Sequence, residues 1–314
     1  MRRAGLLLAL MAALASAGCG DESPDAPRPP PTSEAEPPAP PPTAPEPATP
    51  ATPGPTSAPE LPPPRSRAMS WAAAGAFVWH ETDVDPELLG RDLLDAGFGW
   101  VAVFLHDGTA EDPVEADWVA RFRRATGLPV GGWGVLRTQP TDEAALADRL
   151  LTRYGLDFYV ADAETEYEYS GAGGKDAARF ERSRAFLTAF RALRPGLPAA
   201  LSSYCRPDMH DLDWASWHTA GFVFLPQAYV NDFGADAAPA ACVRAAAAVF
   251  AAANVHPTIG MYPGARRPLT AAGYARLLRR AGTVGFSVYL AETRMDDRGW
   301  QSLGAAIDSL GIAR

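Results

Sequence analysis

Two carboxylates, Asp162 and Glu164, stand two positions apart at the end of an apolar run, residues 158–161. In a β-strand, residues i and i+2 point to the same face, roughly 6.6 Å apart along the backbone. We therefore expect both carboxylates to project together from the end of a buried strand, with Glu166 in the loop beyond it. Two carboxyl groups at that spacing can share one proton and drive acid cleavage of a glycosidic bond.

Short apolar runs recur along the chain from residue 75, and the run before Asp162 is the fourth of them. Nearly continuous apolar runs of this length are typical of strands that are buried on both faces. The eight runs are GAFVWH (75–80), WVAVFLHDG (100–108), PVGGWGVL (129–136), FYVADAE (158–164), PAALSSYC (198–205), FVFLPQAYV (222–230), PTIGMYPG (257–264) and GFSVYLAE (285–292).

Helical patterns separate these runs, and they begin mostly at prolines or capping residues and end mostly at Gly or Asn. Eight strand–helix units in about 240 residues predict a single (β/α)8 TIM barrel, an α/β fold, over residues 70–314. A doubly wound open sheet is the alternative, but the Gly-rich loop that often follows its first strand is absent here. The patterns cover 86–97, 117–127, 141–155, 176–193, 208–219, 237–253 and 270–281, of which 208–219 is the least regular.

Polar and aromatic residues gather at the ends of the predicted strands, where a barrel of this kind has its active site. Tyr and Trp rings stack on sugar faces, while amide, guanidinium and carboxylate groups bond sugar hydroxyls. Trp133 has a second interpretation, as packing inside the barrel. The candidate substrate-binding residues are Asp83, His80, Trp133, Arg137, Tyr204, Gln227, Tyr229, Tyr262, Tyr289 and Glu292.

The segment Asp162-Ala163-Glu164, at the end of the fourth predicted strand, resembles the barrel glycoside hydrolases. The likeness is greatest to the superfamily that contains bacterial muramidases and chitinases. It implies that Glu164 is the general acid, and that Asp162 tunes it or steadies an N-acetyl group of the substrate. The longer chitinase motif, with further Asp residues before the pair, is absent, and Asp83 matches the strand-one Asp of muramidases only loosely.

Three other interpretations stay open. In the first, Asp162 and Glu164 form a structural ion pair with Arg137. In the second, the chain is a carbohydrate-binding barrel without catalysis. Alternatively, His80, His106 and Glu292 join the two carboxylates in a metal-dependent phosphodiesterase, although the expected His-Arg-Gly opening is missing after His80. A second carboxylate 5–10 Å from Glu164 would favour an enzyme. We expect no cofactor, because no Cys/His spacing resembles a zinc site.

The composition limits the partners. A net charge of −9 and a pI near 5.1 argue against nucleic acid as a partner. We expect a carbohydrate substrate, from the residues at the strand ends, and a monomer. Cys205 and Cys242 form a disulfide or remain as two buried thiols; the sequence leaves both possibilities open.

The first residues predict export and a lipid anchor. Residues 1–18 have the basic start and short apolar core of a signal peptide, and the ending Ala17-Gly18-Cys19 resembles a bacterial lipobox, which implies lipidation of Cys19. Residues 19–69 form a linker rich in proline, with 19 of the chain's 31 prolines. We expect the barrel to be held at the cell envelope through this lipid alone, on the outer membrane in a Gram-negative cell, because Gly20 rather than Asp follows Cys19.

Overall fold

The structure is a computed structural model that describes residues 68–79, 83–115, 117–169, 174–262, 269–291 and 295–312. The predicted signal peptide, Cys19, nearly all of the linker, His80 and Glu292 lie outside these residues. Nothing in the structure therefore bears on those predictions.

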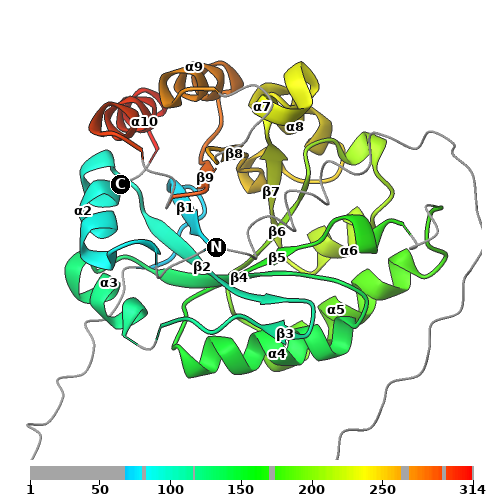
Figure 1. The fold of residues 1–314 in the computed structure, drawn as a ribbon. Coiled ribbons are helices and arrows are strands. Elements are labelled where there is room, and N and C mark those ends of the chain that lie inside the picture. The colour runs from blue at the N-terminus through cyan, green and yellow to red at the C-terminus, as the bar shows by residue number, and fades with distance from the viewer. Residues whose placement is uncertain are drawn as a thin grey trace, which may run out of the picture. The chain divides into compact units, whose positions relative to one another are not determined.

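Eight parallel strands close into a barrel within the described residues, which confirms the predicted fold (Figure 1). Closure is shown by β1, which pairs with both β2 and β9. A two-residue strand, β3 (Ala110–Glu111), adds to β2 in the antiparallel sense. The barrel strands are β1 (Gly75–Val78), β2 (Trp100–Asp107), β4 (Val130–Val135), β5 (Tyr159–Asp162), β6 (Ala199–Tyr204), β7 (Val223–Ala228), β8 (Thr258–Gly260) and β9 (Ser287–Tyr289).

Helices surround the ring of strands (Figure 1), and several begin and end where the sequence predicts. Asp85 caps α2 by accepting from two backbone N–H groups, and Gly97 ends it in the left-handed conformation, φ 83°. The helices are α2 (Pro86–Ala96), α3 (Trp118–Thr126), α4 (Pro140–Arg153), α5 (Arg179–Leu193), α6 (Trp214–Thr219), α7 (Val230–Phe233), α8 (Pro239–Ala246), α9 (Ala271–Ala281) and α10 (Asp297–Leu310).

The predicted helix over 237–253 is wrong in length. Helix α8 ends at Ala246, and the chain then turns through a short 3-10 helix at Ala252–Asn254. The turn buries Phe250 against Phe224, with ring centroids 4.9 Å apart. Tertiary packing has overridden the high helix propensity of an alanine-rich segment.

Large aromatic rings fill the inside of the barrel. Trp100 and Phe158 meet edge to face, with centroids 5.4 Å apart, and Trp71 packs against both. Gly75 and Gly131 make room for them, because a Cβ at either position would lie within 2.5 Å of a Trp100 or Phe158 ring atom. Met69 also packs on this cluster.

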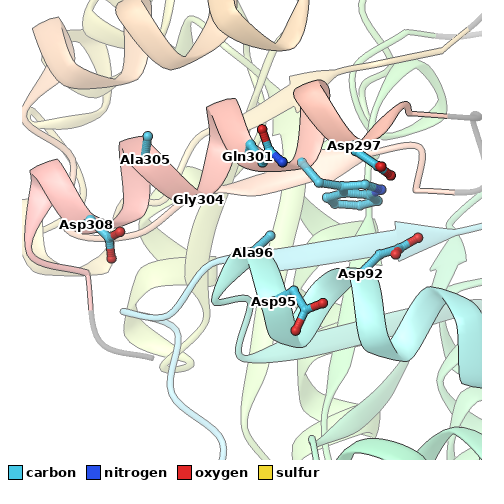
Figure 2. Close-up of a pocket in the computed structure, with 9 residues that line it drawn as sticks. Asp92, Asp95, Ala96, Asp297, Gln301, Gly304, Ala305 and Asp308 are labelled. Carbon is cyan, nitrogen blue, oxygen red and sulfur yellow. The ribbon is translucent and has the colours of Figure 1, made fainter.

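The outer layer has a cavity of about 530 Å³ between α2 and α10 (Figure 2). Burial and the neighbouring charge of Asp297 raise the pKa of Asp92 in its wall. None of the lining residues comes from a strand end, so this acidic cavity is separate from the predicted carboxylate site. Its lining is Asp92, Asp95, Ala96, Asp297, Trp300, Gln301, Gly304, Ala305 and Asp308.

Cys205 and Cys242 form a disulfide, which decides between the two possibilities left open above. Their Cα atoms are 4.8 Å apart, and the bridge joins the residue after β6 to helix α8 across a sequence separation of 37. The bridge therefore fixes the residue that follows β6 to helix α8.

We predict that the double variant Cys205→Ala/Cys242→Ala loses about 3 to 4 kcal/mol of unfolding free energy, because the unfolded chain regains the entropy of the closed loop. Urea denaturation measures this loss. In a chain carrying Cys19→Ser, two free thiols after unfolding without reductant would contradict the bridge.

Candidate active site

Strand β5 presents Asp162 and Glu164 on the face toward the barrel axis. Val160 belongs to the interior core, whereas Ala161 and Ala163 belong to the core between strands and helices. Since side chains alternate along extended backbone, Asp162 shares the face of Val160. Backbone bonds hold this end in register: Leu136 N donates to Asp162 O at 2.8 Å, and Ala163 N donates to Ser202 O at 3.0 Å.

Gln227, from β7, binds both carboxylates with one nitrogen. Its Nε2 donates to Asp162 Oδ1 at 3.1 Å and to an oxygen of Glu164, and lies 3.3 Å from Ser202 Oγ. Two oxygens bonded to one nitrogen are no more than about 6 Å apart. The structure thus brings together three predicted residues from two strands, and we call Asp162 and Glu164 the carboxylate pair.

Burial raises the pKa of both members of the carboxylate pair. For Asp162 the shift is large, and the charge of Glu164 adds to it. For Glu164 the bond from Gln227 lowers the pKa, while the charge of Glu166 raises it. Such groups titrate as a unit. The pair therefore holds a proton at a higher pH than a free carboxyl group does, as a general acid requires.

Arg137 lies beside the pair without a hydrogen bond to either member in the described residues. Its guanidinium binds Asp107, with Nε 2.5 Å from Oδ1, and Glu166, with Nη1 2.5 Å from Oε1. Its charge lowers the pKa of both Asp162 and Glu164. Arg137 therefore forms its ion pair with Glu166 and not, in the described residues, with the carboxylate pair. A direct contact from Arg137 to substrate stays a prediction.

Three tyrosines from successive strand ends, Tyr229, Tyr262 and Tyr289, form a tyrosine cluster. Tyr229 lies 5.6 Å from Tyr262 and 5.9 Å from Tyr289, centroid to centroid. Burial raises the pKa of Tyr229, and the neighbouring tyrosines and the carboxylate pair raise it further. The effect of the pair on Tyr229 shows that this member of the cluster lies near Asp162 and Glu164.

Trp133 packs inside the barrel, so the second interpretation of this residue is the one the structure supports. It is 4% exposed, its Nε1 donates to Val78 O at 3.0 Å, and its ring lies 4.5 Å from Phe104 and 5.9 Å from Tyr289. The ring packs against Tyr289 of the tyrosine cluster and does not present an open face for stacking on a sugar.

Asp83 and Tyr204 differ in how they relate to the pair. Asp83 is exposed, and in the described chain no hydrogen bond or ion pair joins it to Asp162 or Glu164. Tyr204 ends β6 with its hydroxyl 3.3 Å from Oγ1 of Thr165, the residue after the predicted acid. The structure therefore brings Tyr204 to the site. It shows no contact that supports Asp83 as the strand-one Asp of muramidases.

His106 uses both ring nitrogens in hydrogen bonds within the described residues. Its Nδ1 is 2.8 Å from Gly108 O and its Nε2 is 2.8 Å from the Tyr159 hydroxyl, so both ring nitrogens are engaged. Burial lowers its pKa to about 4, which keeps the ring neutral. No group of three His, Cys, Asp or Glu side chains suited to a metal occurs among the described residues.

Comparison with known proteins shows the fold. No family model matches the chain, and no curated protein matches it. Solved structures do: a glycoside hydrolase family 18 chitinase from Cycas revoluta, in complex with (GlcNAc)4, has a TM-score of 0.56 and 8% identity over 74% of this chain and 99% of its own. A class V chitinase from Nicotiana tobaccum has 0.56 and 10%, over 74% and 98%.

A family 18 N-acetylglucosaminidase from Paenibacillus barengoltzii is similar to the same degree, with a TM-score of 0.55 and 11% identity over 74% of this chain and 99% of its own. The chain therefore has the (β/α)8 fold of family 18 glycoside hydrolases.

Among the described residues, no helix is long and apolar enough to cross a membrane.

We predict that Gln227→Met raises the pKa of Glu164, because the amide donor that favours the charged carboxylate is lost while side-chain length is kept. A ¹³C titration of labelled Glu carboxyl groups measures the shift directly. Glu181→Gln, an exposed change on α5, is the matched control. A Glu164 titration that moves to lower pH in Gln227→Met contradicts the assigned bond.

Proposed function

We propose that this protein is a glycoside hydrolase in which Glu164 is the general acid and Asp162 assists it. The observation that carries the proposal is the carboxylate pair: two carboxyl groups bonded to one amide at the C-terminal end of β5, with the pKa of each raised by burial. In a (β/α)8 barrel this end of the strands is where catalysis occurs.

Glu164 takes the role of the acid because the segment Asp162-Ala163-Glu164 resembles barrel glycoside hydrolases in which this Glu is the general acid. Glu164 donates its proton to the glycosidic oxygen, and the bond between that oxygen and the anomeric carbon breaks as the leaving sugar departs. Positive charge then develops on the ring that remains. Asp162, held by the same Gln227 amide, supports that charge or steadies the group that neutralises it. A water oxygen then bonds to the anomeric carbon, and its proton returns to the Glu164 carboxylate.

We further propose an N-acetylglucosamine-containing glycan as the substrate. Two of the similar structures described above are chitinases, and one of them is a complex with (GlcNAc)4. An acetamido carbonyl can itself attack the anomeric carbon, so such a substrate requires no separate carboxylate nucleophile. Asp162, a few ångströms from Glu164, is suited to hold the acetamido N–H, and the tyrosine cluster supplies an apolar wall for the ring.

We predict that the full chain cleaves such oligosaccharides and that Glu164→Gln lowers kcat by about 10²- to 10⁴-fold, because the amide cannot donate a proton as an acid. Reducing-end release over time measures it, and Glu181→Gln on α5 is the control that should keep its activity. Full activity in Glu164→Gln refutes the assignment. Binding of an oligosaccharide without cleavage by the wild type favours the non-catalytic carbohydrate-binding barrel instead.

We propose, from the sequence alone, that the barrel is tethered to the cell envelope. The support is the lipobox-like ending at Cys19 and the proline-rich segment behind it, which in extended form reaches on the order of 100 Å. A tether of that length lets a surface-bound hydrolase act on a glycan some distance from the membrane.

We predict that the wild-type chain incorporates labelled fatty acid and partitions into detergent, whereas Cys19→Ser does neither, since only the thiol can carry the lipid. Expression in a bacterial host with labelled palmitate measures both properties. Equal labelling of the two chains rules out the anchor at Cys19.

A further inference from the structure

We propose that Glu168 and His210 form a positioning pair that fixes the Tyr204 ring beside the acid Glu164. The inference rests on the proposed function, because it gives Tyr204 the role of a wall of the sugar site. Sequence reasoning identified neither Glu168 nor His210, since both lie in irregular segments between strands and helices.

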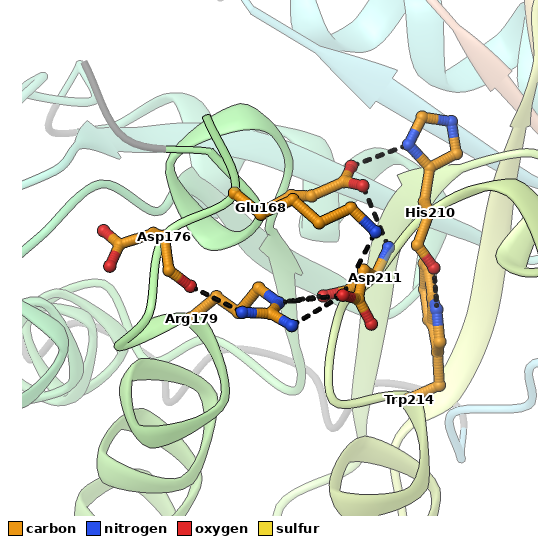
Figure 3. A network of polar contacts seen from close by, with 7 residues as sticks. Glu168, Asp176, Arg179, His210, Asp211 and Trp214 are labelled. Carbon is orange, nitrogen blue, oxygen red and sulfur yellow. Dashed lines mark hydrogen bonds and ion pairs between the residues drawn. The ribbon is translucent and has the colours of Figure 1, made fainter. Parts of the chain in front are cut away.

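Glu168 is a fully buried carboxylate that the catalytic steps do not use. It is 0% exposed and follows the 3-10 helix Thr165–Tyr167, which begins directly after Glu164. One of its oxygens accepts from Asp211 N at 2.9 Å, and the other lies 2.7 Å from His210 Nδ1 (Figure 3). The carboxylate therefore ties the loop that carries the acid to the loop that follows β6.

The loop around His210 is held at several further points (Figure 3). Arg179 and Lys175 bind the Asp211 carboxylate, at 2.6 Å and 3.1 Å, and Trp214 Nε1 donates to His210 O at 3.0 Å. With its backbone fixed and one ring nitrogen bonded to Glu168, the imidazole has a single orientation. These bonds thus hold the His210 ring in the position where it contacts Tyr204.

His210 supports Tyr204 by stacking. The two rings are nearly parallel, with an interplanar angle of 11° and centroids 3.7 Å apart. On the other side, the Tyr204 hydroxyl meets Thr165 Oγ1. Burial raises the pKa of Tyr204, and the charge of Glu164 raises it further, so this hydroxyl remains a proton donor beside the acid. Tyr204 is half-buried, which leaves part of it open to a bound sugar.

A buried carboxylate contributes little to stability compared with apolar side chains of the same size. Its effect is on orientation. A carboxylate acceptor requires a hydrogen on Nδ1 of His210, as carboxylates do for histidines in many active sites. Glu168 therefore sets the tautomer of His210 and its ring plane, and through the stack it sets the position of Tyr204.

The first test is the tautomer of His210 in the full chain with ¹⁵N-labelled histidine, which needs no substrate. We expect the proton on Nδ1 in the wild type. In Glu168→Gln the amide carbonyl accepts from Asp211 N and the amide NH2 faces Nδ1, so the proton should move to Nε2. A wild-type Nε2–H tautomer, or no change in Glu168→Gln, overturns the positioning pair.

The second test is a double-mutant cycle on oligosaccharide cleavage. We expect Glu168→Gln to lower kcat/KM about tenfold alone and less than twofold in a chain that already carries Tyr204→Ala, which lacks the ring, because residues that act through one another are not additive. His210→Phe, which keeps the stack but not the bond, should lose less than Glu168→Gln. His218→Gln, an exposed histidine on α6, is the control.

The outcomes separate the two proposals. Fully additive effects overturn the role of Tyr204, and so does unchanged activity in Tyr204→Ala. If Glu168→Gln does not fold, the wild-type tautomer and the pair His210→Phe and Tyr204→Ala decide the matter. A wild type that neither cleaves nor binds any glycan refutes the proposed function, while the tautomer measurement still decides whether Glu168 orients His210.

Discussion

The hydrogen bonds from Gln227 to Asp162 and Glu164 are the interaction on which the site depends. Two buried carboxyl groups on one strand face repel each other when both are ionised. One amide donor from β7 holds both, across the intervening strand β6, so the carboxylate pair has this geometry only when β5, β6 and β7 lie in the correct register. Strand register and the geometry of the pair are therefore the same structural requirement.

Strand register makes that requirement strict. Asp162 pairs with Ser202, and Tyr204 pairs with Gln227. A slip of one residue would turn every side chain of a strand to its other face. It would send Asp162 and Phe158 into the helix layer and bring Tyr159 inward, so that the packing of Phe158 against Trp100 would be lost. The bulky interior therefore enforces the register that the carboxylate pair needs.

The sequence predicts the barrel, the carboxylate pair and Gln227, because all three depend on strand periodicity and on the direction of parallel strands. It does not decide whether Trp133 stacks on sugar or packs inside, since both roles use the same residue at the same place. Glu168 and His210 could not be predicted at all. They meet through irregular loops, where no period links sequence position to a face of the fold.

Arg137 shows how the site balances its charges. Burial raises the pKa of both carboxyl groups of the pair and so favours their protonated forms. The nearby Arg137 guanidinium opposes this shift by lowering both pKa values, and a guanidinium bonded directly to the pair would lower them further. Asp107 and Glu166 hold Arg137 at an intermediate position, close enough for its charge to act without a hydrogen bond to the pair. The ion pairs around the site therefore set its acidity from a distance.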